Sequence, residues 1–380
     1  MKPKFKLLKV GIVCYPSIGG SGIVATNLGK ELAKRGHEVH FISYEKPFRL
    51  NLKSKGIFFH KVNINEYSLF KYPDYTLPLA VTIGSVQEKY KLDILHVHYA
   101  VPHATAALLA CQMLKQCNIK FPKIITTLHG TDITLLAKDP ALFSIIKYSL
   151  EKSSGITAVS KSLREDTQKV LNTKKPIEVI YNFFDTAKPK NRRESIRKKL
   201  GIKNNELLLI HLSNLRSFKK IPDLLKIVKK IKSPSKLLIL AGGDFSQYLP
   251  LVKKLGIKNK ILVKENVLDI GSYLNAADLG IYTSKKESFG LGILETLAYA
   301  KPVLATNIGG IPEVVENNKT GFLFKIGDIN GFAKKIDFLY KNPQILNKMG
   351  QEARKQAKEK FSVNKIVKKY LDYYYKILNK

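Results

Sequence analysis

Two carboxylates and a run of small residues form the strongest candidate for a site that binds a phosphate-linked ligand. The segment SKKESFGLG at 284–292 opens a predicted helix, and Glu287 and Glu295 stand eight residues apart, so both can face one cleft. Small residues bring backbone amides close to a ligand, and the helix dipole favours an anion there. Beside a phosphate, a carboxylate suits hydrogen bonds from sugar hydroxyls, although solvated or surface-paired carboxylates fit the spacing equally well.

A pair of cations follows the first predicted strand of the second half. Arg216 and Lys219 come soon after the apolar run 207–212, at the strand end where open α/β sheets bind ligands. Two cations at such a place suit a diphosphate leaving group. Arg216 is the more informative of the two, because only 8 of the 65 basic residues are Arg.

Histidines lie at two predicted strand ends of the first half. His129 follows a strand directly, which favours a polar group of a site over a core histidine or a metal ligand. We expect the rings of His96 and His98 to lie on opposite faces of the preceding strand, which argues against a shared metal site. Tyr99 and His103 border the same strand end, where surface positions are equally compatible with the sequence.

The elements that position these residues alternate as they do in parallel α/β sheets. An apolar run at 10–15 leads into the glycine-rich turn GGSG at 19–22, then an amphipathic helix that ends near Gly36, then a strand at 38–43. The turn offers amides to an anion but lacks the G-x-G-x-x-G spacing of a dinucleotide site, so a phosphate contact and a simple tight turn both fit.

The same alternation appears again after a polar linker at 185–197. We therefore predict an α/β protein of two Rossmann-like domains that face a central cleft, with residues 1–184 in the first and 185–361 in the second. A C-terminal helix at about 362–380 is expected to pack back on the first domain. Its four tyrosines, at 370 and 373–375, are read as packing groups in preference to an aromatic binding platform.

The charge of the chain is its most unusual bulk property. Among 380 residues, 65 are Lys or Arg and 30 are Asp or Glu, which gives a formal net charge of +35. Such an excess first suggests a nucleic acid or an anionic membrane as partner. However, 57 of the basic residues are Lys, whereas base and phosphate recognition favours Arg, and both halves share the excess. We favour a dispersed basic surface and no nucleic-acid partner.

Cysteine content and hydropathy limit the cellular compartments in which we expect to find the protein. Cys14, Cys111 and Cys117 are too few for a disulfide framework or a zinc site, which favours the reducing cytoplasm. The first apolar run is too short for a signal peptide, and no apolar stretch approaches the roughly 20 residues that span a bilayer. We expect a cytoplasmic protein without stable membrane insertion, and the sequence allows a homodimer.

Together these residues resemble the retaining glycosyltransferases of family four, which have the GT-B fold. Glu287 and Glu295 match the family's Glu, seven residues, Glu motif, and Arg216 and Lys219 match its diphosphate-binding pair. Some family members transfer N-acetylglucosamine from UDP-N-acetylglucosamine to L-malate, the first step of bacillithiol biosynthesis. The first half resembles those members in the segments CYPSIGGSG at 14–22, PFRLN at 47–51, FKYP at 70–73, HYAVPH at 98–103, LHGTD at 128–132 and YNF at 181–183.

This resemblance implies UDP-N-acetylglucosamine as donor, L-malate as acceptor, retention at the anomeric carbon, and no metal or other cofactor. It implies that Glu287 accepts a hydrogen bond from the sugar 3-hydroxyl and that Glu295 accepts hydrogen bonds from the ribose hydroxyls. It also implies that His129 lies near the sugar 6-hydroxyl. The implied catalytic residues are Glu287, His129, Lys219 and Arg216. The implied donor-binding residues are Gly20, Asn214, Ser288, Phe289, Gly290, Leu291 and Glu295. The acceptor-binding residues that we assign are Ser17, Arg49, Tyr99, Thr131 and Asn182, with Arg49 as the main cation for malate.

Two positions depart from the family pattern, in which Gly is usual. Glu265 follows a predicted strand and is expected to perturb packing of the nucleotide base, whereas Ala300 ends a helix and is expected to affect stability. Two alternatives remain: a family-four transferase with another sugar or a lipid acceptor, and a basic nucleic-acid-binding protein.

Overall fold

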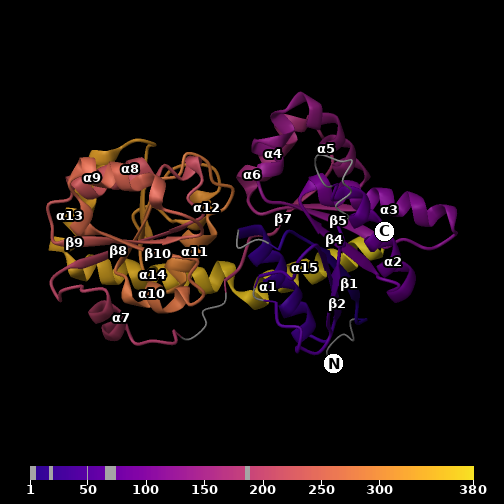
Figure 1. The fold of residues 1–380 in the computed structure, drawn as a ribbon, viewed down its shortest axis with the longest axis horizontal. Helices are drawn as coiled ribbons and strands as arrows, with labels where there is room; N and C mark the ends of the chain where they lie inside the picture. The colour runs from indigo at the N-terminus through magenta and orange to yellow at the C-terminus, as the bar shows by residue number, and fades with distance from the viewer. Residues whose placement is uncertain (1–5, 17–19, 49, 65–73, 185–188) are drawn as a thin grey trace. The chain divides into compact units, whose positions relative to one another are not determined.

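A computed structural model of the chain describes residues 6–16, 20–48, 50–64, 74–184 and 189–380. Its internal contacts divide the chain into two compact units (Figure 1). The first unit comprises Met1–Tyr181 and Asn364–Lys380, and the second comprises Asn182–Val363. The domain boundary predicted from the sequence lies after residue 184, with the return to the first domain at about 362.

The first unit is built on a seven-stranded parallel sheet in the order β3-β2-β1-β4-β5-β6-β7. Strand order therefore reverses between the neighbours β1 and β4, where open α/β sheets bind ligands. The strands are β1 (Lys9–Val13), β2 (Glu38–Ser43), β3 (Ile57–Lys61), β4 (Ile94–His98), β5 (Lys123–Leu128), β6 (Gly155–Ala158) and β7 (Ile177–Val179). The helices and helical turns are α1 (Gly20–Lys34), α2 (Thr76–Tyr90), η1 (Ala100–Ala104), α3 (Thr105–Gln116), α4 (Thr131–Thr134), η2 (Leu136–Lys138), α5 (Pro140–Lys152), α6 (Lys161–Leu171) and α15 (Val363–Leu378).

The strands of this sheet are apolar over nearly their whole length because both faces are covered. All five residues of β4 are buried. One face packs Val13 and Val97 against Leu79 and Ile83 of α2 and Ala107 of α3. This buried frame fixes the strand ends from which the polar candidates project.

The last helix, α15, completes the first unit from the far end of the chain (Figure 1). Tyr370, Tyr373 and Tyr374 are buried. The Tyr373 hydroxyl accepts a hydrogen bond from the N–H of Ile156 in β6 at 3.0 Å, and the Tyr374 hydroxyl lies 2.6 Å from Nδ1 of His96 in β4. These tyrosines are therefore packing groups, as the sequence predicted.

The second unit contains a six-stranded parallel sheet in the order β10-β9-β8-β11-β12-β13, which reverses between β8 and β11. Its strands are β8 (Leu207–Ser213), β9 (Ser235–Ala241), β10 (Ile261–Glu265), β11 (Leu279–Tyr282), β12 (Val303–Thr306) and β13 (Gly321–Phe324). Its helices and turns are α7 (Arg193–Lys199), η3 (Ser217–Lys219), α8 (Ile221–Lys230), η4 (Ser246–Tyr248), α9 (Leu249–Leu255), η5 (Lys258–Lys260), α10 (Ile270–Ala276), α11 (Leu291–Ala298), α12 (Ile311–Val314), α13 (Ile329–Lys341) and α14 (Pro343–Phe361).

Alternation along β8 divides the core of the second unit into two layers. Leu207 and Leu209 point to the side covered by α8 and α13, whereas Leu208 and Ile210 point to the side covered by α7 and α10. Two buried layers on one sheet are the arrangement that the repeated α/β pattern predicts.

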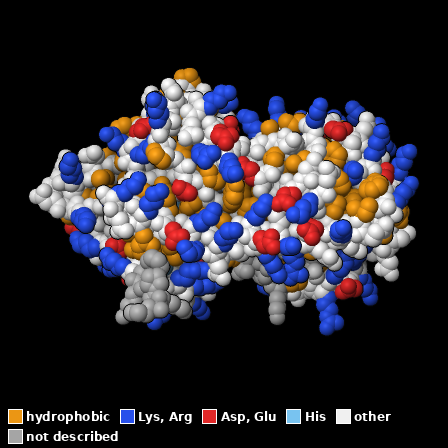
Figure 2. Space-filling model, turned by 180° about the vertical axis from the view of Figure 1, so that it is seen from behind, with side chains coloured by type: hydrophobic (Ala, Val, Ile, Leu, Met, Phe, Trp, Pro, Cys, Tyr) orange, Lys and Arg blue, Asp and Glu red, His pale blue; other side chains and the backbone are white. Residues whose placement is uncertain are grey.

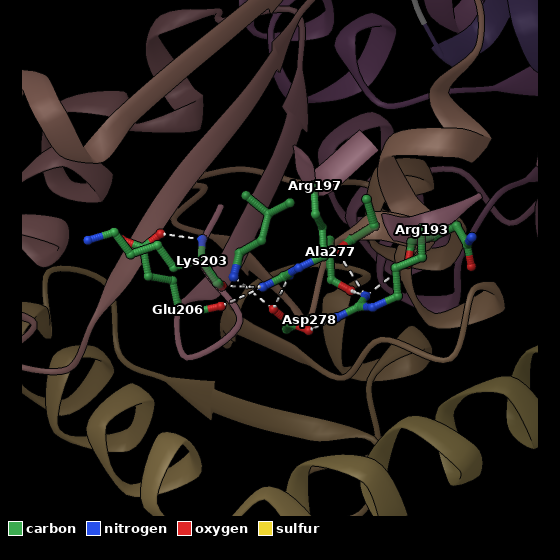
Figure 3. A network of polar contacts seen from close by, with 9 residues as sticks. Arg193, Arg197, Lys203, Glu206, Ala277 and Asp278 are labelled. Carbon is green, nitrogen blue, oxygen red and sulfur yellow. Dashed lines mark hydrogen bonds and ion pairs between the residues drawn. The ribbon is translucent and has the colours of Figure 1, made fainter. Parts of the chain in front are cut away.

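A network around Asp278 attaches α7 to this sheet (Figure 3). Arg193 pairs with one carboxylate oxygen of Asp278, and Arg197 lies 3.0 Å from the other. Arg193 also donates to the carbonyl of Ala277 at 2.7 Å, and Asp278 accepts the N–H of Leu208 at 2.8 Å. The network satisfies polar groups at the start of β8 and after α10.

Basic side chains are spread across the face drawn in Figure 2, mixed with acidic, apolar and neutral groups. On that face they form no continuous stripe. Among the described residues, no helix is long and apolar enough to cross a membrane.

Candidate functional site

The candidate residues of the second unit lie at its switch point. Arg216 and Lys219 follow β8, and Glu287 follows β11, the neighbouring strand. The carboxyl ends of adjacent parallel strands meet at one sheet edge, so residues far apart in the sequence converge there.

Lys219 and Glu287 form an ion pair, with Nζ and Oε2 2.5 Å apart. Both side chains are mostly buried, with 16% and 17% exposed. The backbones of their loops are also joined, because the N–H of Lys285 donates to the carbonyl of Phe218 at 2.7 Å and the Thr283 hydroxyl donates to the carbonyl of Lys219 at 3.1 Å. A cation and a carboxylate are thus held side by side as one rigid group.

The loop that carries Glu287 rests on the turn at Gly309 and Gly310. The N–H of Gly310 donates to the Glu287 carbonyl at 3.0 Å. A Cβ atom on Gly309 would lie 2.1 Å from that carbonyl oxygen, and one on Gly310 would lie 2.2 Å from the carbonyl oxygen of Ser288. Only residues without a Cβ allow the two backbones to approach this closely.

The helix α11 begins at Leu291, directly after Gly290, whose φ of 93° lies in the left-handed region. The first amides of a helix have no intrahelical acceptor, so this end favours an anion. Phe289 is buried beside it and Glu295 is 6% exposed within the helix. Ser288, which is partly exposed, lies in the chain between Glu287 and the first residue of this helix.

Tyr282 and His211 form hydrogen bonds that stabilise this region, and neither residue was predicted from the sequence. The Tyr282 hydroxyl donates to the carbonyl of Gly292 at 2.8 Å, and its pKa is raised by burial and further by Glu295 and Glu287, so both carboxylates lie near its ring. Nδ1 of His211 donates to the carbonyl of Ile281 at 2.8 Å. Their signal in the sequence is their position on strands β11 and β8, next to the ends that carry site residues.

Asn214 and Arg216 differ in how the fold holds them. Asn214 has a buried side-chain oxygen without a hydrogen-bond partner among the described residues. Arg216 is exposed and forms no ion pair in the described part of the chain. Leu215 between them has a φ of 53°, a costly conformation for a non-glycine residue that clusters at functional sites.

In the first unit, the candidates lie around the end of β4 and its two neighbours. Gly20 begins α1 after β1 and is exposed, and Tyr99 follows β4. His129 follows β5, with the centroid of its ring 5.2 Å from that of Tyr99. Thr131, partly buried, begins α4. The sheet thus brings Tyr99 and His129 together.

The expectation that His96 and His98 point to opposite faces is wrong. Residues two apart on a strand lie on the same face, and these rings stack with centroids 4.5 Å apart. His98 and His103 are also fully buried, so neither is a surface residue.

Asp132 is a further buried group that the sequence analysis did not assign to the site. Its Oδ1 accepts the N–H of Gly130 at 2.9 Å. Burial raises the pKa of its carboxyl to about 6, although backbone N–H groups, including those at Gly130 and His129, oppose the change. Asp132 therefore orders the loop that presents His129.

Ser17, Arg49 and Asn182 are the other residues predicted to bind the acceptor, and Glu265 is one of the two departures from the family pattern. Ser17 and Arg49 lie outside the described residues. Asn182 belongs to the second unit, is buried, and has a side-chain oxygen without a partner among the described residues. Glu265 ends β10 and accepts the N–H of Phe245 at 2.9 Å. Within the described ranges, no group of three or more His, Cys, Asp or Glu residues could hold a metal ion.

Family models cover most of the chain in two blocks. Residues 18–188 match "Glycosyltransferase Family 4", and residues 192–356 match "Glycosyl transferases group 1". The first matched segment covers β2–β7 of the first sheet, and the second covers all strands of the second sheet; between them they include the loops that carry His129, Lys219 and Glu287.

Named relatives extend this match. The chain is 44% identical over 375 residues to N-acetyl-alpha-D-glucosaminyl L-malate synthase of Bacillus anthracis, covering 98% of this chain and 97% of the relative. A glycosyltransferase from Rickettsia africae has a TM-score of 0.80 at 24% identity, covering 98% of this chain and 99% of that one. Anabaena Alr3699/HepE in complex with UDP-glucose also has a TM-score of 0.80, at 19% identity with 96% and 98% coverage. The expected GT-B fold is thereby confirmed.

Proposed function

Because the chain belongs to the glycosyltransferases of family 4, we propose that it transfers N-acetylglucosamine from UDP-N-acetylglucosamine to the hydroxyl of L-malate. The observation that carries the substrate assignment is the 44% identity to the Bacillus anthracis synthase over 98% of the chain. The reaction is the first step of bacillithiol biosynthesis.

The second unit supports a role in donor binding. Its switch point combines Lys219 and Glu287 with the amide end of α11, so cationic, anionic and N–H groups occur within one loop cluster. A diphosphate suits the cation and the helix amides, and hydroxyls suit the carboxylates. In this proposal Glu287 binds the sugar and Glu295 binds the ribose. Asn214, Ser288, Phe289, Gly290 and Leu291 line the donor site, and Gly20 is assigned to donor binding as well.

The chemical step breaks the bond between the anomeric carbon and the β-phosphate oxygen and forms a bond from the malate hydroxyl oxygen to that carbon. The hydroxyl proton passes to the leaving phosphate, so no side chain has to act as nucleophile. Attack from the face on which UDP departs gives retention. Arg216 and Lys219 stabilise the charge that develops on the leaving group, so their loss lowers kcat more than donor binding.

The first unit supports the acceptor assignment. Tyr99 and Thr131 lie at the ends of neighbouring strands beside His129, where hydroxyl groups can donate to a small dicarboxylate. We assign Arg49 as the main cation for the malate carboxylates and Ser17 and Asn182 as further donors. The unpaired state of the three cysteines supports a cytoplasmic reaction.

The test is direct. The protein is incubated with UDP-N-acetylglucosamine and L-malate in the presence of EDTA, and mass spectrometry is used to detect glucosaminyl malate. Succinate, which lacks the attacking hydroxyl, serves as the acceptor control and yields no product. Lys219→Ala is expected to lower kcat with little change in UDP affinity.

Two outcomes contradict parts of this proposal. Failure with malate while another sugar or a lipid acceptor is glycosylated overturns the acceptor assignment and favours the alternative transferase. A requirement for added metal overturns the proposed independence from cofactors.

A further inference from the structure

Behind His129 lies a group of buried histidines to which the proposed reaction gives no role. Neither His96 nor His98 has any exposed surface. His129 follows β5, which pairs with the strand that carries these two residues. Nδ1 of His98 lies 2.8 Å from Nε2 of His129, so one ring donates a hydrogen bond to the other.

Both rings in this contact are neutral at physiological pH. Burial, followed by the neighbouring histidines, lowers the pKa of His98 well below its usual range, and burial and His103 lower that of His129 to about 3. Neighbouring histidines are the charged groups that lower these two pKa values, and the Tyr99 ring also lies beside His129, with the ring centroids 5.2 Å apart. A neutral imidazole carries one N–H, so the direction of this hydrogen bond fixes the tautomer of both rings.

The surroundings of His98 favour one direction. Its Nε2 is buried and has no hydrogen-bond partner in the described part of the chain. If His129 donated, His98 would accept at Nδ1 and would carry its own proton on Nε2 as a buried N–H without an acceptor. Buried donors without acceptors are rare and costly. If His98 donates, its N–H is satisfied and only a lone pair is left without a partner.

The ring of His98 is also held in place. Nδ1 of His103 bonds to the His98 carbonyl, which fixes the backbone. The stacked ring of His96 is fixed at both nitrogens, by the Tyr374 hydroxyl at 2.6 Å and the Thr127 hydroxyl at 2.6 Å. His98 therefore has little freedom to turn away from His129.

We propose that His98 is a positioning residue that donates Nδ1–H to Nε2 of His129, so that His129 presents its own Nδ1–H as a donor to the transferred sugar. Nδ1 of His129 forms no hydrogen bond among the described residues, and is thus the ring nitrogen left for a ligand. The identity of that ligand rests on the proposed function. The direction of the hydrogen bond does not, because it follows from burial and geometry alone.

The direct test is the tautomer of His129 in the unliganded protein. Protein labelled with ¹⁵N-histidine is examined by NMR, and the His129 signals are identified by their loss in His129→Asn. We expect the proton on Nδ1 in the wild-type protein. In His98→Leu, which fills the space but cannot donate, Nε2–H should become populated.

Activity provides a second readout with a conservative variant. His98→Asn retains a side-chain N–H at the position of Nδ1 and should keep kcat/KM within about threefold of wild type. His98→Leu should lose roughly tenfold, which is the scale of one hydrogen bond. The control is His40→Asn, another fully buried histidine of the first unit, which bonds to His60 and Glu38 and should leave kcat/KM unchanged.

The outcomes separate this inference from the proposed reaction. A wild-type His129 ring protonated on Nε2 overturns the positioning role, whatever the acceptor substrate is. Equal activity of His98→Leu and wild type, or equal loss in the Leu and Asn variants, also contradicts it. An Nδ1–H ring in a protein that makes no glucosaminyl malate supports the positioning role and rejects the proposed substrate.

Discussion

Replacing Gly309 by Ala should disable the loop that carries Glu287 without unfolding the second unit. The new Cβ would lie 2.1 Å from the Glu287 carbonyl oxygen, whereas real Cβ atoms keep at least 3.0 Å, so the loop has to move by about 0.9 Å. That carbonyl accepts the N–H of Gly310, and the side chain of the same residue pairs with Lys219. A misplacement of ~1 Å at reacting groups costs about 100-fold in rate.

The cost in stability should be smaller than the cost in rate. Overpacking costs about 1–3 kcal/mol, and the left-handed φ of 53° adds about 1 kcal/mol for a residue with a Cβ. Thermal unfolding should therefore still show a cooperative transition, at a lower temperature, while kcat falls about 100-fold.

Gly327→Ala is the matched control. Gly327 also has a left-handed φ, of 83°, but a Cβ there would meet no atom within 4 Å. It should lose about 1 kcal/mol of stability and keep its kcat. Steady-state kinetics, calorimetric titration with UDP and thermal unfolding of both variants test this reasoning. If Gly309→Ala kept wild-type kcat, or if both variants lost kcat equally, the steric argument would be refuted.

Two further predictions concern the stability of the second unit. Ala300 follows α11 with a left-handed φ of 59°, and its N–H donates to the carbonyl of Leu297 while the N–H of Lys301 donates to the carbonyl of Thr296. Glycine suits this position at the end of a helix better than alanine, so Ala300→Gly should stabilise the protein by about 1 kcal/mol. An unchanged or lower unfolding temperature would contradict this. Burial, aided by the charges of Arg193 and Arg197, lowers the pKa of Lys301 from 10.5 to about 8. The charged Lys301 therefore destabilises the folded state below pH 8, and this penalty disappears as the pH rises to 10.5. Lys301→Met should be more stable than wild type by roughly 2 kcal/mol at pH 7 and by progressively less above pH 8, which denaturant titrations at several pH values would measure.

The sequence was informative about the positions of strand ends and less so about contacts between them. Apolar runs followed by small or polar residues are sufficient to place Lys219 after β8 and Glu287 after β11, because strand order and direction in such sheets are strongly constrained. The ion pair between these two residues joins positions 68 apart, and no local pattern specifies it.

The histidines show the same limit. The face shared by His96 and His98 follows from their spacing, and the expectation of opposite faces misapplied the period of a strand. The contacts of His96 with Tyr374 and of His98 with His129 depend on strand pairing and on a helix 278 residues away. Those contacts become visible only when the sheet is assembled.

The return of α15 to the first unit has a consequence for how the chain folds while the ribosome synthesises it. Its tyrosines cover His96 and the backbone of Ile156. In the sequence, however, the whole second unit, residues 182–363, separates α15 from the rest of the first unit. At 5–20 residues per second, a ribosome needs roughly 10–40 s to make that intervening unit. Nascent chains usually fold from the N-terminus, but here the first domain has to wait with an uncovered polar and aromatic surface until the second has been synthesised. The domain that is translated first is therefore the last to be finished.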